Sequence, residues 1–216
     1  MKLGLEGKNV LITGGSKGIG KACALLFAEE GANLALAARS ADTLEEAAAE
    51  VSKVGPGEVF TFTGDMTQWE DVKRVADSLE RGAGFVVLVV GNDGVKPTYW
   101  ETTAGAANAA GINVASSMAE QYGPYGIRVN TVNPGPVDPD RWDGLEKAMA
   151  RDMGITQEQA HDFAVSSIPL GRIARADEVA DLVVFLASER ASFINGSHVV
   201  IDGAQRKAKM DRDTGR

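Results

Sequence analysis

The sequence has a single cysteine, Cys23, among its 216 residues. One thiol cannot form an intramolecular disulfide, and it cannot supply the paired thiolates of a zinc site. Long apolar runs are also missing. Runs such as 85–90 and 182–187 fall far short of the roughly 20 residues that a membrane-spanning helix needs. We therefore expect Cys23 to be a small apolar residue on a helix face.

Basic residues are scarce, with 22 Lys and Arg against 30 Asp and Glu and a formal net charge of −8. A nucleic-acid partner is disfavoured because binding to a phosphate backbone needs a basic surface. A nucleotide ligand is still possible, since it needs only a local positive charge. The first eight residues are short and mixed in character, unlike a secretory leader. Together these features predict a soluble protein of a reducing compartment, most simply the cytoplasm.

The sequence does have many glycines, 25 against 7 prolines. Such an excess indicates tight turns and close backbone approaches rather than linkers. The length suits one well-buried domain, and two would be cramped. We expect this domain to span residues 1–205, followed by a polar tail at 206–216 that is frayed because it has no apolar periodicity.

Short β-branched runs alternate with longer Ala-, Leu- and Glu-rich segments along the chain. The alternation predicts an α/β fold with a doubly wound parallel sheet and right-handed crossovers. Asp42 is expected to cap the second helix, with Glu45 at the capping-box position. The predicted strands are 8–12, 34–38, 59–62, 85–90, 128–132 and 198–201. The predicted helices are 19–30, 42–53, 67–80, 103–121, 141–163 with breaks, and 176–187.

The most specific motif is a glycine-rich turn, Thr13-Gly-Gly-Ser-Lys-Gly-Ile-Gly20, directly after the first predicted strand and opening the first helix. Glycines permit a tight turn there and let backbone N–H groups reach a pyrophosphate at the helix N-terminus. Glycines alone could mark a plain strand-to-helix turn. The strand before the motif and the helix after it favour nucleotide binding.

The spacing Thr-Gly-x-x-x-Gly-x-Gly resembles the short-chain dehydrogenase/reductase family, and the resemblance continues along most of the chain. The further matching segments are Gly64-Asp-Met-Thr67, Tyr125-Gly-Ile-Arg-Val-Asn130, Asn133-Pro-Gly-Pro-Val137, Pro169-Leu-Gly-Arg172, Phe185-Leu-Ala-Ser188 and 194–203. The resemblance implies a Rossmann-like single domain and an oxidoreductase acting on a small carbonyl or alcohol. The residues that it implies for cofactor binding, outside the second strand, are Gly14, Ser16, Lys17, Gly18, Ile19, Gly20, Asp65, Met66, Pro134, Gly135 and Val137.

The choice of cofactor depends on the end of the second predicted strand. A carboxylate there would bind a free ribose 2′-hydroxyl and repel a 2′-phosphate. The resemblance places that position at Ala38, which is neutral and is followed by Arg39. Arg39 and Lys17 can both make strong charge-assisted bonds to a phosphate. NADP(H) is therefore favoured over NAD(H), the alternative being that Arg39 is a solvated surface residue.

The chemistry of the family is missing from the expected positions. Members use a Ser that holds the substrate oxygen, a Tyr that transfers a proton and, four residues later, a Lys that lowers the pKa of the phenol. Counting from the motifs above puts the Ser position at Gly91, the Tyr position at Ala104 and the Lys position at Asn108. The resemblance therefore gives no catalytic residue.

One central strand–helix unit is also missing. Only a short Arg-Gly-Ala-Gly link, residues 81–84, separates the third predicted helix from the strand at 85–90, where the family has a further strand, an Asn-Asn-Ala-Gly turn and a long helix. In a second registration, 91–94 is a degraded form of that turn, and the fifth strand of the family is lost or the two strands are fused. Because the runs 8–12 and 85–90 are apolar on both faces, we expect them to pair directly. In the family, the lost helix forms half of the dimer interface. Any homo-oligomer of this chain would therefore lack that half of the usual interface.

Other groups are not expected to replace the missing ones, and no metal-ligand cluster is visible. Tyr122 and Tyr125 are predicted to serve packing, and His198 to lie in the core. Surface-loop positions are predicted for Tyr99 and Lys96, and a solvated or capping role for His161. Neither histidine has a Ser or Cys partner at motif spacing.

Two functions therefore stay open. The first is an NADP(H)-dependent oxidoreductase, which the cofactor motifs favour. The second is a module without turnover that binds NADP(H) or a protein, which Gly91, Ala104, Asn108 and the missing unit favour. The substrate pocket would fall in the segment 138–170, where the sequence does not reveal its ligand.

Overall fold

The computed structural model describes residues 2–77, 84–98, 101–137 and 139–206. The chain divides into two compact units: residues 1–84 with 176–193 form the first, and residues 85–175 with 194–216 form the second. The predicted tail at 206–216 lies almost entirely outside the described residues, as does Tyr99.

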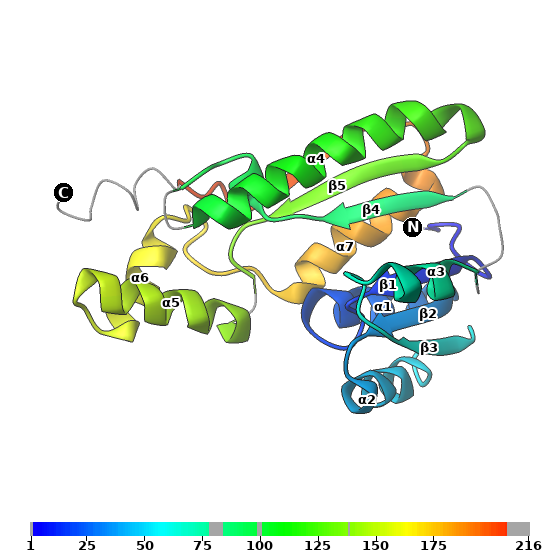
Figure 1. Cartoon of the computed structure of the whole chain (residues 1–216), viewed down its shortest axis with the longest axis horizontal. Helices are drawn as coiled ribbons and strands as arrows, with labels where there is room; N and C mark the ends of the chain where they lie inside the picture. Colours follow the sequence, from blue (N-terminus) through cyan, green and yellow to red (C-terminus); the bar gives the residue numbers. More distant parts are fainter. Residues whose placement is uncertain (1, 78–83, 99–100, 138, 207–216) are drawn as a thin grey trace. The chain divides into compact units, whose positions relative to one another are not determined.

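The first unit is built on a parallel three-stranded sheet in the order β1-β2-β3 (Figure 1). Its strands are β1 (Asn9–Thr13), β2 (Asn33–Ala38) and β3 (Val59–Thr63), and its helices are α1 (Gly18–Glu29), α2 (Ala41–Val51), α3 (Trp69–Asp77) and α7 (Ala176–Ala187), with the short 3-10 turn η4 (Glu189–Ala191). These elements match the sequence prediction to within a few residues at their ends, except that α3 is described only to Asp77.

The core of the first unit lies around β2, the central strand, where Leu34 and Leu36 are fully buried. Helix α1 packs against α7 and turns Cys23 and Phe27 inward. Burial raises the pKa of the Cys23 thiol to about 12, so this residue is the inert apolar side chain that the sequence predicts.

The second unit has its own parallel sheet in the order β4-β5-β6, with α4 lying along β5 (Figure 1). The strands are β4 (Phe85–Val89), β5 (Arg128–Pro134) and β6 (His198–Ile201). The helices are α4 (Thr102–Tyr122), α5 (Pro139–Met153) and α6 (Gln157–Ser166), and the 3-10 turns are η1 (Asn92–Gly94) and η3 (Gly123–Tyr125). Small residues on α4 allow close packing on the sheet, where Ala115, Ala119 and Val129 form a buried cluster.

Helices α5 and α6 pack against each other around Met149, Ala160 and Ala164. Thr156 begins α6 with a capping box: its hydroxyl accepts from the Gln159 N–H at 3.2 Å, and the Gln159 side chain accepts from the Thr156 N–H at 2.9 Å. The capping box predicted at Asp42 is wrong, because α2 begins one residue earlier with Ser40 as its N-cap.

The predicted pairing of the runs 8–12 and 85–90, which would join the two units, stays a prediction. Strand β4 pairs with β5, whose Val129 and Val132 are fully buried, and β1 pairs with β2. Among the described strands, β1 and β4 are therefore edges of two different sheets. Apolar character on both faces is typical of a strand inside a parallel sheet, but it does not identify the neighbouring strand.

Three side chains are more exposed than predicted. Tyr122 is 37% exposed rather than packed. Tyr125 is 73% exposed rather than packed. His198 lies exposed on the edge strand β6 rather than in the core. Within the described residues, no helix is both long enough and apolar enough to cross a membrane.

Candidate functional site

The glycine-rich turn after β1 is held by its own backbone. Gly14 adopts φ = 71°, and its N–H donates to the Ala37 carbonyl at 2.7 Å, which ties the turn to β2. A Cβ atom on Gly20 would lie 2.2 Å from the Gly14 carbonyl oxygen. Only glycine fits at position 20, so the start of α1 can lie directly on the turn.

Helix α1 begins with groups suited to an anion. Its N-cap, Lys17, makes no side-chain capping bond, and the first turn contains no acidic residue. The N–H groups of a first helical turn lack intrahelical partners, and the helix dipole adds partial positive charge there. The Lys17 side chain is exposed, whereas Ser16 and Ile19 are half-buried. A phosphate group fits this arrangement.

The carboxyl ends of β2 and β3 carry Arg39 and Asp65, one residue past Ala38 and two past Thr63. Arg39 is exposed, while Asp65 and Met66 are half-buried. The N–H and hydroxyl of Thr67 donate to the Asp65 carboxylate at 3.0 and 2.9 Å. These bonds, helped by the nearby charge of Arg39, lower the pKa of Asp65 below its ordinary value.

A second cation near this end of β3 already has partners. Arg74 donates to the Thr63 carbonyl at 2.6 Å and to the Asp71 carboxylate at 2.8 Å. The other Asp71 oxygen accepts from the Asp65 N–H at 2.8 Å. The segment that follows β3 is thereby fixed, and the exposed Arg39 is the cation placed to meet an added anion at the end of β2.

In the second unit, the predicted loop residues at the end of β5 are tightly packed. Pro134 and Val137 are buried, and the Gly135 N–H donates to the Ile201 carbonyl at 3.0 Å. A Cβ atom on Gly135 would lie 2.8 Å from the Cβ of Asp202. These residues support the loop itself, whatever contacts they make with a ligand.

The three positions at which the sequence predicts the family's Ser, Tyr and Lys, namely 91, 104 and 108, lie at the junction of β4, η1 and α4. Asn108 donates to the buried Asp93 carboxylate at 2.8 Å. A Cβ atom on Gly91 would lie 2.3 Å from Asp93 Oδ1 and 2.8 Å from Asn108 Nδ2. The structure thus brings positions 91 and 108 together, while Ala104 is exposed one turn earlier on α4.

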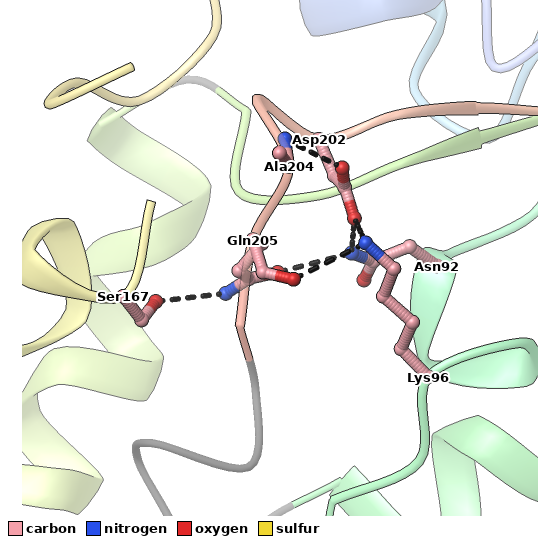
Figure 2. Close-up of polar contacts among 6 residues, drawn as sticks. All are labelled: Asn92, Lys96, Ser167, Asp202, Ala204 and Gln205. Carbon is pink, nitrogen blue, oxygen red and sulfur yellow. Dashed lines mark hydrogen bonds and ion pairs between the residues drawn. The ribbon is translucent and has the colours of Figure 1, made fainter. Parts of the chain in front are cut away.

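A buried polar cluster next to this junction was not predicted (Figure 2). The Asp202 carboxylate, 5% exposed, accepts from Lys96 Nζ at 2.5 Å and from Asn92 Nδ2 at 3.0 Å. Gln205 accepts from both residues: its side-chain oxygen from Asn92 at 3.0 Å and its carbonyl oxygen from Lys96 at 3.1 Å. Burial alone would raise the pKa of Asp202, but the bonds from Lys96 and Asn92 and the Lys96 charge outweigh it and lower that pKa.

This cluster corrects the prediction for Lys96: the residue does lie in a loop, but it is half-buried and its ammonium group is paired with Asp202. Because a buried carboxylate needs a partner, the signal available in the sequence was Asp202 directly after an apolar strand. Lys96 lies 106 positions away along the chain, and spacing alone could not pair the two residues. His161 likewise has a partner, since its Nδ1 lies 2.7 Å from a Glu146 oxygen.

Comparison with known proteins identifies the fold and its family. A family profile described as "short chain dehydrogenase" matches residues 8–98. A second, described as "Enoyl-(Acyl carrier protein) reductase", matches residues 89–204, more than half of the chain. The chain belongs to the short-chain dehydrogenase/reductase family.

Individual members of the family align with nearly the whole chain. Glucose 1-dehydrogenase of Gluconobacter oxydans is 31% identical, with 91% of each chain covered. The NADPH-dependent reductase BacG of Bacillus subtilis is 27% identical, covering 93% of this chain and 98% of its own. L-Sorbose reductase of Gluconobacter frateurii, solved with NADPH and L-sorbose, superposes with a TM-score of 0.84 at 27% identity, covering 95% of this chain and 98% of its own. The predicted Rossmann-like α/β fold is confirmed.

The alignment with the glucose 1-dehydrogenase spans 252 positions, although this chain has only 216 residues. The relative therefore has residues at positions where this short-chain dehydrogenase/reductase has none. Among the residues that the structure describes, no group of three or more His, Cys, Asp or Glu side chains could hold a metal ion.

Proposed function

We propose that this chain binds NADP(H) through the glycine-rich turn and the end of β2. The turn and the first turn of α1 offer backbone N–H groups and no acidic side chain, which suits a pyrophosphate. By the family pattern, Gly14, Ser16, Lys17, Gly18, Ile19 and Gly20 contact the phosphates. Asp65 and Met66 take the adenine side, and Pro134, Gly135 and Val137 take the nicotinamide side.

The preference for the 2′-phosphate is supported by one observation: the residue after β2 is the exposed Arg39, and no carboxylate ends that strand. A guanidinium can bind a phosphate with two parallel bonds. The charge of Arg39 is the smallest of the effects on the pKa of Asp65, so Asp65 does not compete strongly with a phosphate for this guanidinium. The NADPH named for the sorbose reductase and for BacG fits this proposal.

Reversal of the charge at Arg39 tests the proposal. We expect Arg39→Asp to weaken NADP⁺ binding about 10- to 150-fold, the equivalent of roughly 1.5–3 kcal/mol for hydrogen bonds to a charged group, and to leave NAD⁺ binding unchanged. Lys53→Asp makes the same charge change in an exposed residue beyond the far end of α2 and should affect neither cofactor. Calorimetric titration measures the affinity for both cofactors. An equal loss of affinity for NADP⁺ and NAD⁺ in Arg39→Asp would contradict the assignment.

We further propose that the chain does not catalyse hydride transfer. NADP(H) supplies the hydride when it is bound, but reduction of a carbonyl also builds negative charge on its oxygen, which a positioned donor must meet. Gly91 and Ala104 have no donor side chain, and the Asn108 amide donates to Asp93. General acid catalysis alone contributes about 10²–10⁴-fold, so the loss of all three groups should abolish turnover.

The second candidate function is an active oxidoreductase, which family membership itself favours. Purified protein, NADPH and a panel of small aldehydes and ketones distinguish the two, with cofactor binding measured on the same preparation. We expect binding without oxidation of NADPH. Carbonyl reduction that survives repurification and disappears on heat treatment would establish the enzyme instead.

A further inference from the structure

A chain of hydrogen bonds in the second unit runs from a backbone carbonyl to a serine hydroxyl. Asn133 Nδ2 lies 3.2 Å from the Val90 carbonyl oxygen, and Asn133 Oδ1 lies 2.8 Å from Thr131 Oγ1. Thr131 Oγ1 lies 3.1 Å from His198 Nδ1. The last hydrogen bond of this series joins His198 Nε2 and Ser116 Oγ, which lie 3.0 Å apart. The proposed cofactor binding uses none of these side chains.

The fold explains this arrangement. Residues Thr131 of β5 and His198 of β6 are direct partners in the parallel ladder, and α4, which carries Ser116, packs along β5. Thr131 and Asn133 are fully buried. Ser116 is half-buried and His198 is exposed, so the buried end of the chain is rigid and the reactive end can meet a molecule from solvent.

The direction of each bond follows from its acceptors. A carbonyl oxygen can only accept, so the Asn133 amide nitrogen faces Val90 and its oxygen faces Thr131. The one hydroxyl proton of Thr131 goes to that oxygen, and Thr131 Oγ1 must then accept from His198 Nδ1–H. The other ring nitrogen, Nε2, carries no proton in the neutral imidazole, and it faces the Ser116 hydroxyl as an acceptor.

We propose that Ser116 and His198 form a nucleophile–base pair that reacts with small activated carboxylic esters. A serine bonded to an imidazole that is itself oriented by a third group has the geometry of hydrolytic dyads and triads on unrelated folds. Here the orienting group is Thr131, a positioning residue held by Asn133.

The reaction balances within these groups. Ser116 Oγ attacks the ester carbonyl carbon while His198 Nε2 takes the hydroxyl proton. The bond between that carbon and the leaving oxygen then breaks, and the same proton passes from His198 to the departing alkoxide or phenoxide. The product is an acyl ester on Ser116, which water releases with His198 acting again as the base.

The neighbouring Ser117 provides a matched control. Each serine oxygen lies 3.2 Å from a carbonyl oxygen one turn back along α4, that of Ile112 for Ser116 and that of Asn113 for Ser117. Ser116 has one hydroxyl proton, so donation to His198 Nε2, at the shorter distance of 3.0 Å, replaces donation to Ile112. Among the hydrogen bonds described, only Ser116 faces an imidazole. The one thiol, Cys23, is buried with its pKa raised to about 12, so it does not compete for the reagent.

The test is reaction with p-nitrophenyl acetate, followed by release of p-nitrophenolate and by peptide mapping of the acetylated protein. We expect one acetyl group on Ser116. Ser116→Ala and His198→Gln should slow the reaction about 10²–10⁴-fold, the usual contribution of a general base, and Ser117→Ala should react like the unaltered chain. Labelling that is spread over lysines, falls on Ser117, or survives His198→Gln would overturn the proposal.

Two substitutions at Thr131 test the positioning role. Thr131→Val removes the hydroxyl at similar volume and should slow acylation, while Thr131→Ser restores the hydroxyl and should restore the rate. Circular dichroism shows whether each variant is folded, and equal rates for both folded variants would overturn this role. The site is independent of Arg39 and of the glycine-rich turn, so acylation and NADP⁺ binding succeed or fail separately.

Discussion

At the scale of single residues, Asp93 and Asn108 occupy the space where the family's chemistry is expected. Their hydrogen bond fills the volume beside Gly91, and a side chain at position 91 would begin 2.3 Å from the Asp93 carboxylate. A serine at position 91 therefore requires the buried Asp93 side chain to move. The packing around positions 91 and 108 is therefore built on the Asp93 side chain.

The first prediction is that restoring the catalytic side chains does not restore turnover. In the variant with Gly91→Ser, Ala104→Tyr and Asn108→Lys, the new ammonium at position 108 should pair with Asp93 rather than tune the phenol. An error in geometry of about 1 Å can already cost about 10²-fold in rate. NADPH oxidation with a panel of ketones is the measurement.

A fourth substitution separates two causes of this failure. Adding Asp93→Ala removes both the crowding at position 91 and the competing carboxylate. We expect this variant to be inactive as well, because the substitutions do not replace the strand–helix unit that the sequence is predicted to lack. Turnover in the fourfold variant alone would show that Asp93 was the only obstacle. Turnover in the threefold variant would show that Asp93 moves aside to accommodate the new side chains.

The second prediction concerns the pH dependence of Asp202. Its pKa in the folded chain lies below the ordinary 3.8. Burial destabilises the charged carboxylate, but the hydrogen bonds from Lys96 and Asn92 and the charge of Lys96 stabilise it by more. This contribution to the free energy of unfolding is present at neutral pH and is lost as the pH falls below 3.8 toward the folded-state value. Asp202→Asn should cost roughly 1.5–3 kcal/mol at pH 7, and progressively less below pH 3.8.

Urea unfolding at several pH values measures this difference. Asp162→Asn, an exposed substitution on α6, serves as the control and should stay within about 0.5 kcal/mol of the unaltered chain. A constant gap between Asp202→Asn and the unaltered chain across the whole acidic range would contradict the assignment.

At the scale of elements, most helices and strands could be predicted because hydrophobic periodicity and the motif after β1 act locally. What could not be predicted depends on partners far along the chain. The neighbour of β4 is β5, more than thirty residues later, and the partner of Lys96 is Asp202. His198 looked like a core residue within an apolar strand, but β6 is an edge strand, and its exposure follows from sheet order.

The third prediction concerns the turn between β1 and α1. Gly20→Ala places a methyl group 2.2 Å from the Gly14 carbonyl oxygen, and overpacking of this kind typically costs about 1–3 kcal/mol. Displacement of the turn should also weaken the binding of NADP⁺. Gly144→Ala in α5 is the control, since a methyl group there meets nothing within 4 Å, and it should stabilise the chain by about 0.5–1 kcal/mol.

Thermal unfolding and NADP⁺ titration report the two effects of Gly20→Ala. Unchanged stability would mean that the start of α1 does not rest on the turn. Lower stability with unchanged NADP⁺ binding would separate the turn from the cofactor.

At the scale of the whole molecule, each of the two units has its own parallel sheet. The described strands form β1-β2-β3 in one unit and β4-β5-β6 in the other, so that β2 and β5 each bond to two neighbours while β1 and β4 each bond to one. Backbone groups with one neighbouring strand open more readily than those in the middle of a sheet.

The fourth prediction is therefore a pattern of amide hydrogen exchange. Segments covering β2 and β5 should exchange slowest, and β1 and β4 should exchange faster than the central strand of their own sheet. Exchange monitored by mass spectrometry at neutral pH gives the comparison. Protection of β1 and β4 equal to that of β2 and β5 would show that the two edges pair in solution.

The rate at which Cys23 is alkylated in the native protein reports how often the first unit opens. The thiol is 4% exposed on α1, and burial raises its pKa to about 12, so an alkylating reagent added to the native protein finds almost no thiolate to modify. Each modification event therefore counts one opening of α1 away from β2 and α7. With one thiol in the sequence, the mass of the whole protein records how often the nucleotide-binding unit opens, and NADP⁺ bound at the turn should slow that count.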